Sequence, residues 1–335
     1  MQQLDFDTYL KKFRAFRALH KSENPFYVFF TTELLFWAVK SLSFVPDDVN
    51  VILIGAGLTD EEKRFLDTRV NRPLFLIDEY CDDNDAWKLI FDGSESDFGW
   101  MDIDCFVFNP GLFYEMTRMD GETAINCAFS CRGTGNPDIV FLNSYFLFVN
   151  ADVRDKLTAL GYPLSPRTYI YSEKDKVIHT HSDILTQTHK NVVGHYFADG
   201  VYPGTVEIDF FDTMLLYQLI ARHHGYRLAL VRDQNPDNYF SNDVIHIGGS
   251  SNFSKPHAAV FDLGPMKDHA HYLMIAYNIL SQSVSQLPAH YTLKRKQLRY
   301  ELFKMGVQED KIADYLMTYM RAQNLSEETI ERLLT

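Results

Sequence analysis

Strand-like and helix-like segments alternate through the first third of the chain, and this alternation restricts the folds open to it. Short apolar runs rich in aromatic and β-branched residues predict strands, and segments with apolar residues at helical spacing separate them. Such alternation is typical of βαβ units, in which helices cover a sheet of parallel strands. The predicted strands are residues 25–32, 49–57, 74–78 and 99–108, and the helices between them are 33–42, a segment capped by Thr59, and 85–91. We therefore expect an α/β sheet flanked by helices.

The composition indicates a folded, acidic protein. Hydrophobic residues make up 46% of the 335 residues and aromatic residues 14%, which suits a sizeable core and argues against disorder. The net charge of −13 argues against nucleic acid as a partner, because binding to the phosphate backbone depends on Lys and Arg. Four cysteines without a Cys-x-x-Cys pair are typical of a reducing compartment; they are Cys81, Cys105, Cys127 and Cys131.

The N-terminal segment predicts a cytoplasmic protein. Residues 1–5 offer no basic start followed by an apolar run, and no stretch is long and apolar enough to span a bilayer. Residues 5–21 predict an amphipathic helix in which Lys11, Arg14 and other basic residues occupy much of the polar face. Such a helix either contacts a membrane surface or packs against its own domain, and packing is the more common outcome.

Two carboxylates interrupt the apolar strand predicted at 99–108. Side chains alternate between the faces of a strand, so Asp102 and Asp104 are expected to point the same way. Neighbouring carboxylates repel each other, and burying a charge is costly unless it is paired or binds a metal. A divalent cation resolves this conflict, and Mg²⁺ in particular is usually held by one or two carboxylates together with substrate phosphates. The alternative is a pair of solvated aspartates on an edge strand.

Further candidate binding residues follow the other predicted strands. Ligands of open α/β sheets bind beyond the carboxyl ends of the strands, which places Thr31, Thr32 and Asp78 near Asp102. Lys88, in the helix before the aspartates, is a candidate contact for a diphosphate or ribose, or else a solvated helix lysine. Gly55 and Gly57 lack the third glycine of a dinucleotide fingerprint, because position 60 is an aspartate, and they predict a tight turn between strand and helix.

The aspartate pair in its aromatic strand, followed by Asn109-Pro110, resembles the Asp-x-Asp motif of GT-A fold glycosyltransferases. The resemblance covers roughly residues 25 to 260 as an order of elements. It implies a GT-A-like, Rossmann-like mixed sheet flanked by helices, and a metal-dependent transfer of sugar from a nucleoside-diphosphate sugar, most readily a UDP-sugar. It also implies that Asp102 and Asp104 hold Mn²⁺ or Mg²⁺ against the diphosphate of this donor.

A later segment is similar to the corresponding part of retaining GT-A enzymes. In the stretch 243–249, His246 lies among the apolar residues of a strand end and precedes Gly248-Gly249, and Lys255-Pro256 follows. The resemblance implies that His246 completes the metal site and that Lys255 closes on the diphosphate. The spacing from His246 to Lys255 is longer than in the family pattern, and His257 replaces the expected aromatic residue. Without the resemblance, a histidine on an apolar strand is more often a core or surface residue.

Asp209 is the candidate catalytic base, with Asp212 as the alternate. Ile208, Phe210 and Phe211 flank Asp209 with apolar side chains, and desolvation would raise its pKa towards a useful value. Asp212 begins a predicted helix that ends near Gly225, so it also has a structural interpretation as an N-cap. The family resemblance implies that a carboxylate here deprotonates the acceptor hydroxyl or, in a retaining enzyme, contacts the donor sugar.

The expected organisation is a catalytic domain at 1–290 followed by a C-terminal helical appendage at 291–335. Within the catalytic domain, residues 25–120 form the nucleotide-binding half and 121–290 the acceptor half, where the irregular stretch 161–204 is assigned to acceptor recognition. The appendage predicts two or three amphipathic helices, the last capped by Ser326. It either packs on the domain or makes a homodimer contact.

Three alternative functions remain open from the sequence. A sugar nucleotidyltransferase shares the superfold and the metal, but residues 31–34 lack the glycine- and arginine-rich loop that it normally carries after the first strand. A non-catalytic nucleotide- or sugar-binding protein would not need an intact set of metal ligands. A zinc hydrolase would use His179 and His181, which share a face on a strand, but no second closely spaced pair completes a zinc site.

Overall fold

The computed structural model describes most of the chain outside a central region. It covers 4–132, 138–162, 213–232, 238–247, 270–281 and 287–335, with short pieces at 168–169, 191–192, 195–196, 210–211 and residue 236. No helix within these residues is long and apolar enough to cross a membrane.

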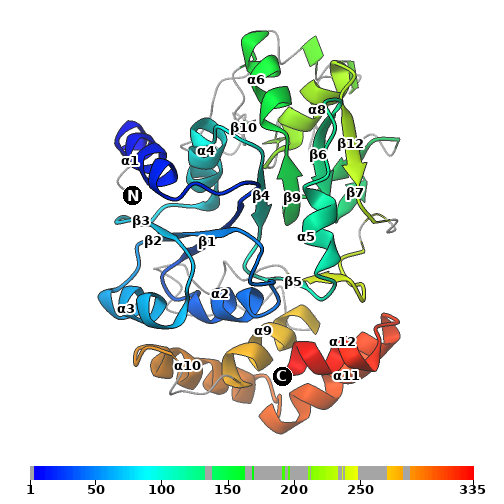
Figure 1. Ribbon diagram of the computed structural model, residues 1–335. Coiled ribbons are helices and arrows are strands. Elements are labelled where there is room, and N and C mark those ends of the chain that lie inside the picture. Colours follow the sequence, from blue (N-terminus) through cyan, green and yellow to red (C-terminus); the bar gives the residue numbers. More distant parts are fainter. Residues whose placement is uncertain are drawn as a thin grey trace, which may run out of the picture.

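A seven-stranded mixed sheet forms the centre of the molecule, in the order β12-β6-β9-β4-β1-β2-β3 (Figure 1). Strand β1 pairs in parallel with β2 on one side and β4 on the other, and β9 runs antiparallel to both β4 and β6. The expected α/β sheet flanked by helices is therefore confirmed. The strands are β1 (Phe26–Thr31), β2 (Val51–Ala56), β3 (Leu74–Ile77), β4 (Phe98–Met101), β6 (Thr123–Cys127), β9 (Phe146–Val149) and β12 (Arg227–Leu230).

Alternate residues of the central strands point to opposite faces of the sheet and pack in two separate hydrophobic cores. Tyr27, Ile52 and Trp100 belong to the core on one face of the sheet, where helices cover them. Phe13 of the first helix is fully buried there against Phe75, which shows that this helix packs on its own domain. The covering helices are α1 (Phe6–Leu19), α4 (Asp83–Gly93), α6 (Ala151–Ala159) and α8 (Leu215–His223).

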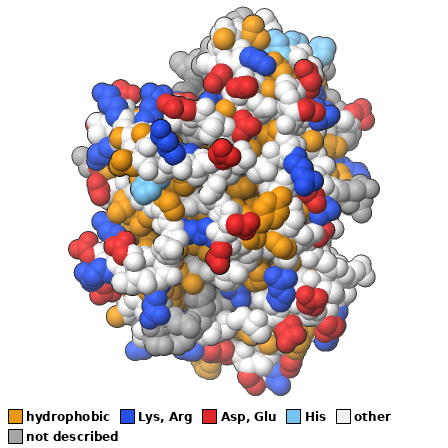
Figure 2. Space-filling model, in the orientation of Figure 1, with side chains coloured by type: hydrophobic (Ala, Val, Ile, Leu, Met, Phe, Trp, Pro, Cys, Tyr) orange, Lys and Arg blue, Asp and Glu red, His pale blue; other side chains and the backbone are white. Residues whose placement is uncertain are grey.

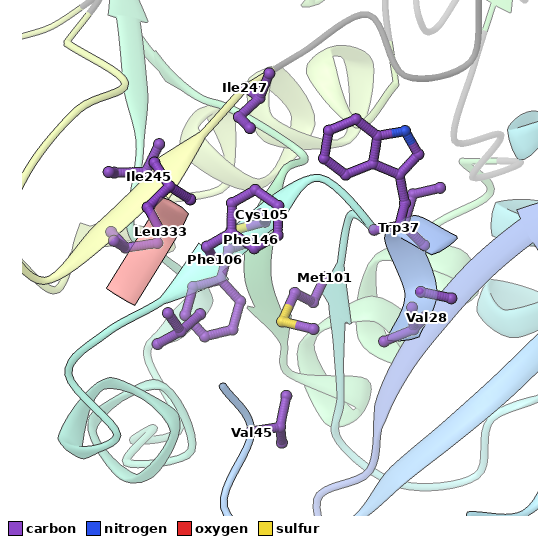
Figure 3. Close-up of a cluster of buried hydrophobic side chains, with 14 of the residues drawn as sticks. Val28, Trp37, Val45, Met101, Cys105, Phe106, Phe146, Ile245, Ile247 and Leu333 are labelled. Carbon is purple, nitrogen blue, oxygen red and sulfur yellow. The ribbon is translucent and has the colours of Figure 1, made fainter. Parts of the chain in front are cut away.

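The core on the opposite face includes the C-terminal helices. Phe26, Val28 and Phe30 of β1 share this core with Leu333, close to the end of the chain. Figure 3 shows Leu333 beside Ile245 and Phe106, and Figure 1 shows the C-terminal helices together below α2 and β5. The helices on this face are α2 (Leu35–Leu42), α3 (Asp60–Arg69), α5 (Gly111–Met116), α9 (Ala270–Ser281), α10 (Tyr291–Lys304), α11 (Ile312–Ala322) and α12 (Glu327–Leu334), with a short 3₁₀ turn at Glu309–Lys311.

The strand predicted at 99–108 is broken at the two aspartates, which corrects the sequence prediction. Strand β4 ends at Met101, residues 102–104 form a turn in which Cys105 N donates to Asp102 O, and β5 (Cys105–Val107) begins a different sheet. The second sheet has two strands, because β5 pairs antiparallel with β13 (Val244–His246). The aspartates therefore lie where the chain passes from the large sheet to the small one.

Two other predicted elements differ in their bounds. Residues 124–131 have the apolar pattern of a single strand, but they are divided between β6 and β7 (Ser130–Arg132), and β7 pairs with β8 (Val140–Leu142) in a two-stranded sheet of its own. Helix α8 begins at Leu215 with Met214 as its N-cap, later than the predicted start at Asp212, which lies outside the described residues. A further short pair joins β10 (Thr168–Tyr169) to β11 (Phe210–Phe211).

The molecular surface carries both signs of charge. Acidic and basic side chains are interspersed on the face shown in Figure 2, so the negative charge there is spread rather than gathered into one patch.

All four cysteines are free thiols, and three of them are buried.

Candidate metal centre

Three side chains from two segments, the turn at 102–104 and strand β13, meet at the junction of the two sheets. Asp102, Asp104 and His246 offer ligand atoms that all lie within 4.8 Å of one another. His246 Nε2 lies 3.3 Å from Asp102 Oδ2 and 3.2 Å from Asp104 Oδ1. Within the described ranges, this is the one group of three or more His, Cys, Asp or Glu side chains arranged to hold a metal ion.

The pairing of β13 with β5 places the histidine. His246 is paired with Cys105 in the antiparallel register, and Ile247 N donates to Asp104 O at 3.0 Å. At the other end of the pair, the carbonyl of Asp243 accepts hydrogen bonds from Phe108 N and Asn109 N. Val244 and Ile245 are fully buried, and a slip by one residue would turn each side chain to the opposite face of the strand and move His246 away from the aspartates.

The three ligands differ in their exposure to solvent. The side chains of Asp104 and His246 are 5% and 7% exposed, whereas that of Asp102 is 29% exposed. Asp104 and His246 therefore form the buried side of the site, and Asp102 forms its solvent-exposed side.

Burial and mutual contact perturb the ionisation of the group. Burial alone would lower the pKa of His246, but the carboxylates of Asp104 and Asp102 outweigh it and raise the pKa to about 9. Burial also raises the pKa of Asp102, an effect that the contact with His246 opposes. Without a cation, a proton on His246 thus supplies the positive charge that the two carboxylates require.

The donor set fits a divalent cation of the Mn²⁺ or Mg²⁺ type. Bonds of roughly 2.1 Å place neighbouring octahedral ligands roughly 3 Å apart, close to the observed separations of 3.2 and 3.3 Å. Carboxylates suit Mg²⁺ and Mn²⁺, and an imidazole ligand favours the transition metal. The residues therefore fit the metal that the resemblance implies.

Two aromatic residues that the sequence analysis did not select support the ligands. Tyr145 lies flat against the imidazole of His246, with ring centroids 3.7 Å apart and an angle of 12° between the planes. Its carbonyl accepts a hydrogen bond from Asp102 N at 2.8 Å. Trp100 Nε1 donates to Asp102 Oδ1 at 2.6 Å. The sequence offered a signal for Trp100, because a residue two positions before Asp102 lies on the same face of an extended segment. It offered no signal for Tyr145.

The other candidate residues that the structure describes, three at strand ends and Lys88 in α4, have protein partners. Thr32, directly after β1, donates through Oγ1 to Glu62 Oε2 at 2.9 Å, and Thr31 is buried beside it. Asp78 accepts a hydrogen bond from the hydroxyl of Tyr9 at 3.5 Å. Lys88 forms an ion pair with Asp92 at 2.8 Å.

Gly55 and Gly57 form the predicted tight turn after β2. Gly57 has a φ of +62°, which is costly for a residue with a side chain, and a Cβ on Gly55 would lie 2.5 Å from Leu58 Cδ1. Asp209, Asp212, Lys255, His179 and His181 lie outside the described residues.

Glu62 in the first turn of α3 is a further residue that the sequence analysis did not single out. It completes a capping box with Thr59 and is fully buried. Its carboxylate also accepts hydrogen bonds from Glu33 N, at the end of β1, and from the hydroxyl of Tyr291 in α10. The Thr-x-x-Glu spacing at 59–62 was the signal for its first role.

Comparison with known families and proteins finds glycosyltransferases. Residues 4–154 match the family described as StrH glycosyltransferase N-terminal domain. The dTDP-dihydrostreptose–streptidine-6-phosphate dihydrostreptosyltransferase of Streptomyces griseus is 25% identical over 277 residues, which cover 71% of each chain. These two matches confirm the predicted enzyme class.

Similarity to solved structures is confined to part of the chain. The apo-form glycosyltransferase GlyE of Streptococcus pneumoniae TIGR4 overlaps 42% of this chain and 38% of its own length, with 20% identity and a TM-score of 0.29. HddC from Yersinia pseudotuberculosis overlaps 42% of this chain and 81% of its own, with 14% identity and a TM-score of 0.30. At these TM-scores the overlaps carry no argument about function.

Proposed function

We propose that this glycosyltransferase moves a sugar from a nucleoside-diphosphate sugar to an acceptor hydroxyl in a metal-dependent reaction. The observation that carries the proposal is the convergence of Asp102, Asp104 and His246 at the junction of the two sheets. Two adjacent carboxylates and a histidine from a distant segment form a site for a cation, and a diphosphate is a ligand that such a cation recruits.

In this proposal the three side chains hold a cation that neutralises charge on the departing nucleoside diphosphate. Asp104 and His246 are almost fully enclosed and hold their positions through the β5–β13 pairing. Asp102 lies on the solvent-exposed side and faces the donor. Mn²⁺ is the preferred cation, because one of the three ligands is an imidazole, and Mg²⁺ is the alternative.

The donor is proposed to be a pyrimidine nucleoside-diphosphate sugar. The family resemblance favours UDP, and the Streptomyces griseus relative carries dTDP in the name of its donor. Both nucleotides present a diphosphate to the cation and differ only at the base and ribose. Thr31, Thr32 and Asp78 are proposed to contact the base and ribose, and Lys88 and Lys255 to add positive charge at the diphosphate.

The acceptor half is proposed to include Asp209, with Asp212 as the alternate. In this role the carboxylate deprotonates the acceptor hydroxyl or contacts the donor sugar. The division into a catalytic domain at 1–290, with halves at 25–120 and 121–290, and a helical appendage at 291–335 belongs to the same proposal. So does a cytoplasmic location, whereas α1 and the C-terminal helices both pack on their own domain.

A thermal-shift screen tests the proposal directly. UDP, dTDP, GDP, CDP and their sugars are each added with and without Mn²⁺ to the wild-type protein and to Asp104→Asn. Binding to the folded state raises the apparent melting temperature by mass action. We expect a Mn²⁺-dependent shift with UDP or dTDP that is absent in Asp104→Asn.

Two outcomes would contradict the proposal. The absence of a shift with every nucleotide would remove the donor site, and equal shifts in wild type and Asp104→Asn would remove the metal site. Consumption of a nucleoside triphosphate together with a sugar 1-phosphate would point instead to a nucleotidyltransferase. Asp67→Asn, which alters an exposed aspartate of α3, is the control for the loss of one carboxylate elsewhere.

A further inference from the structure

The two oxygens of Asp102 have different partners. Oδ1 accepts a hydrogen bond of 2.6 Å from the indole N–H of Trp100, and Oδ2 lies 3.3 Å from His246 Nε2. One side of the carboxylate is thus held by the protein, and the other side faces the remaining ligands. This asymmetry is built into the site without any bound group.

Trp100 is itself fixed in place by aromatic neighbours. It is 2% exposed and stacks on Trp87 of α4, with ring centroids 4.4 Å apart and 24° between the planes. Phe29 of β1 lies near the same indole, with centroids 6.2 Å apart and an angle of 27°. The indole therefore cannot rotate away from Asp102 without disrupting the core between α4 and the sheet.

Among the three ligands, Asp102 has the greatest need for such support. Asp104 is enclosed, and His246 is held by the stacked ring of Tyr145. Asp102 is the partly exposed ligand and lies in a turn rather than in a strand. A carboxylate in this setting can rotate about its Cβ–Cγ bond unless one of its oxygens is restrained.

We propose that Trp100 is a positioning residue that holds Asp102 Oδ1 and so presents Oδ2 alone to the cation. This inference rests on the proposed function, because it assigns a role at the proposed metal site. Hydrogen bonds to ligating groups orient them, and their loss typically weakens metal affinity about 10- to 100-fold. With Oδ1 occupied, Asp102 is a one-oxygen ligand, which leaves coordination positions open for the donor diphosphate.

The chain offers a matched control for the loss of an indole N–H. Trp37 of α2 is fully buried, and its Nε1 has no hydrogen-bond partner among the residues that the structure describes. Figure 3 shows Trp37 within the apolar cluster around Met101 and Val28. Trp100→Phe and Trp37→Phe therefore remove similar buried volumes, but only Trp100→Phe removes a hydrogen bond to a ligand.

The test measures binding of Mn²⁺ alone, by the electron paramagnetic resonance signal of the free ion. We expect the dissociation constant to rise about tenfold or more in Trp100→Phe and to stay at the wild-type value in Trp37→Phe. Wild-type affinity in Trp100→Phe would overturn the role of Trp100, and an equal loss in both variants would show that only packing was disturbed. If the wild type binds no Mn²⁺, the proposed metal site fails as well, so the two failures are distinguishable.

A second substitution guards against a folding defect in Trp100→Phe. Replacing Trp100 with benzothienylalanine keeps the bicyclic ring and exchanges the N–H for sulfur, so the stack with Trp87 is retained. The same rise in the Mn²⁺ dissociation constant is expected, with an unchanged melting temperature in the absence of metal. Wild-type Mn²⁺ affinity in this variant would overturn the proposal.

Discussion

The hydroxyl of Tyr291 donates a hydrogen bond to Glu62 Oε1 at 2.7 Å, although the two residues are 229 positions apart in the sequence. The same hydroxyl accepts a hydrogen bond from Leu35 N, at the start of α2. Glu62 in turn binds Thr32 and Glu33 N, directly after β1. Helix α10, the first helix of the C-terminal segment 291–335, is thus joined to the end of β1, where the donor nucleotide is proposed to bind.

Tyr291→Phe is expected to destabilise the protein by about 1–3 kcal/mol, because it leaves the buried Leu35 N–H without its partner and removes one of the hydrogen bonds to the buried Glu62 carboxylate. Urea unfolding followed by circular dichroism measures the change. Tyr300→Phe is the control, since Tyr300 lies on the same helix but is 60% exposed. If Tyr291→Phe unfolds at the same urea concentration as the wild type, the bridge contributes nothing to stability.

Glu62 is expected to make the stability of the protein depend on pH in the acid range. Burial would raise its pKa, but hydrogen bonds from Thr59, Glu33 N, Tyr291 and Thr32 together lower it below the usual value of 4.5. A depressed pKa contributes stability that is complete above about pH 4.5 and is lost as the pH falls through the folded-state pKa.

Urea unfolding between pH 7 and pH 3 measures this dependence on Glu62. Glu62→Gln should lower stability at pH 7 and flatten its decline with acid. Glu328→Gln, an exposed change in α12, should retain the wild-type profile. Parallel acid profiles for wild type and Glu62→Gln would exclude Glu62 as the responsible group.

His246→Gln is expected to weaken Mn²⁺ binding at least about 100-fold, since even the loss of partners outside the ligand set costs about 10- to 100-fold. It removes the ligand that joins β13 to the aspartates and leaves the two carboxylates without a positive partner. Titration calorimetry of the variant with Mn²⁺ measures the effect. Binding as tight as in the wild type would show that the cation is held without the histidine.

Tyr145→Leu is expected to weaken Mn²⁺ binding by about tenfold, because the stacked ring no longer restrains the imidazole of His246. Tyr145→Phe keeps the ring and should bind Mn²⁺ within about twofold of the wild type, a change of less than about 0.5 kcal/mol. The same titration compares the pair. An equal loss in both variants would assign the effect to the hydroxyl instead of the stacked ring.

Local patterns predicted the elements well and the contacts between them poorly. The caps at Thr59 and Ser326 follow from residue types within one helical turn, and both are present. The break at Asp102–Asp104 was not predicted, because the apolar alternation continues through it while the chain changes sheets. Nothing in the spacing brings Glu62 to Tyr291, since their contact depends on how α10 packs.

In the candidate site too, local sequence patterns identified some residues, and contacts between distant segments identified the others. Asp102 and Asp104 were selected from their own segment, whereas His246 entered through a family resemblance and not through a spacing rule. Trp100 was missed because an aromatic residue in an apolar strand looks like ordinary core, and Tyr145 because it lies in the turn before β9, far from the aspartates in the sequence. Their role depends on contacts that only the folded chain shows.

The junction between the two sheets also bears on how the protein folds. Asp104 and His246 meet only after β13 has docked beside β5, which closes a long loop at an entropic cost. A cation that binds this junction stabilises the docked arrangement and has no equivalent site in the unfolded chain. The proposed cation would therefore stabilise the native topology as well as serve the reaction, and its removal by a chelator is expected to lower the free energy of unfolding together with the activity.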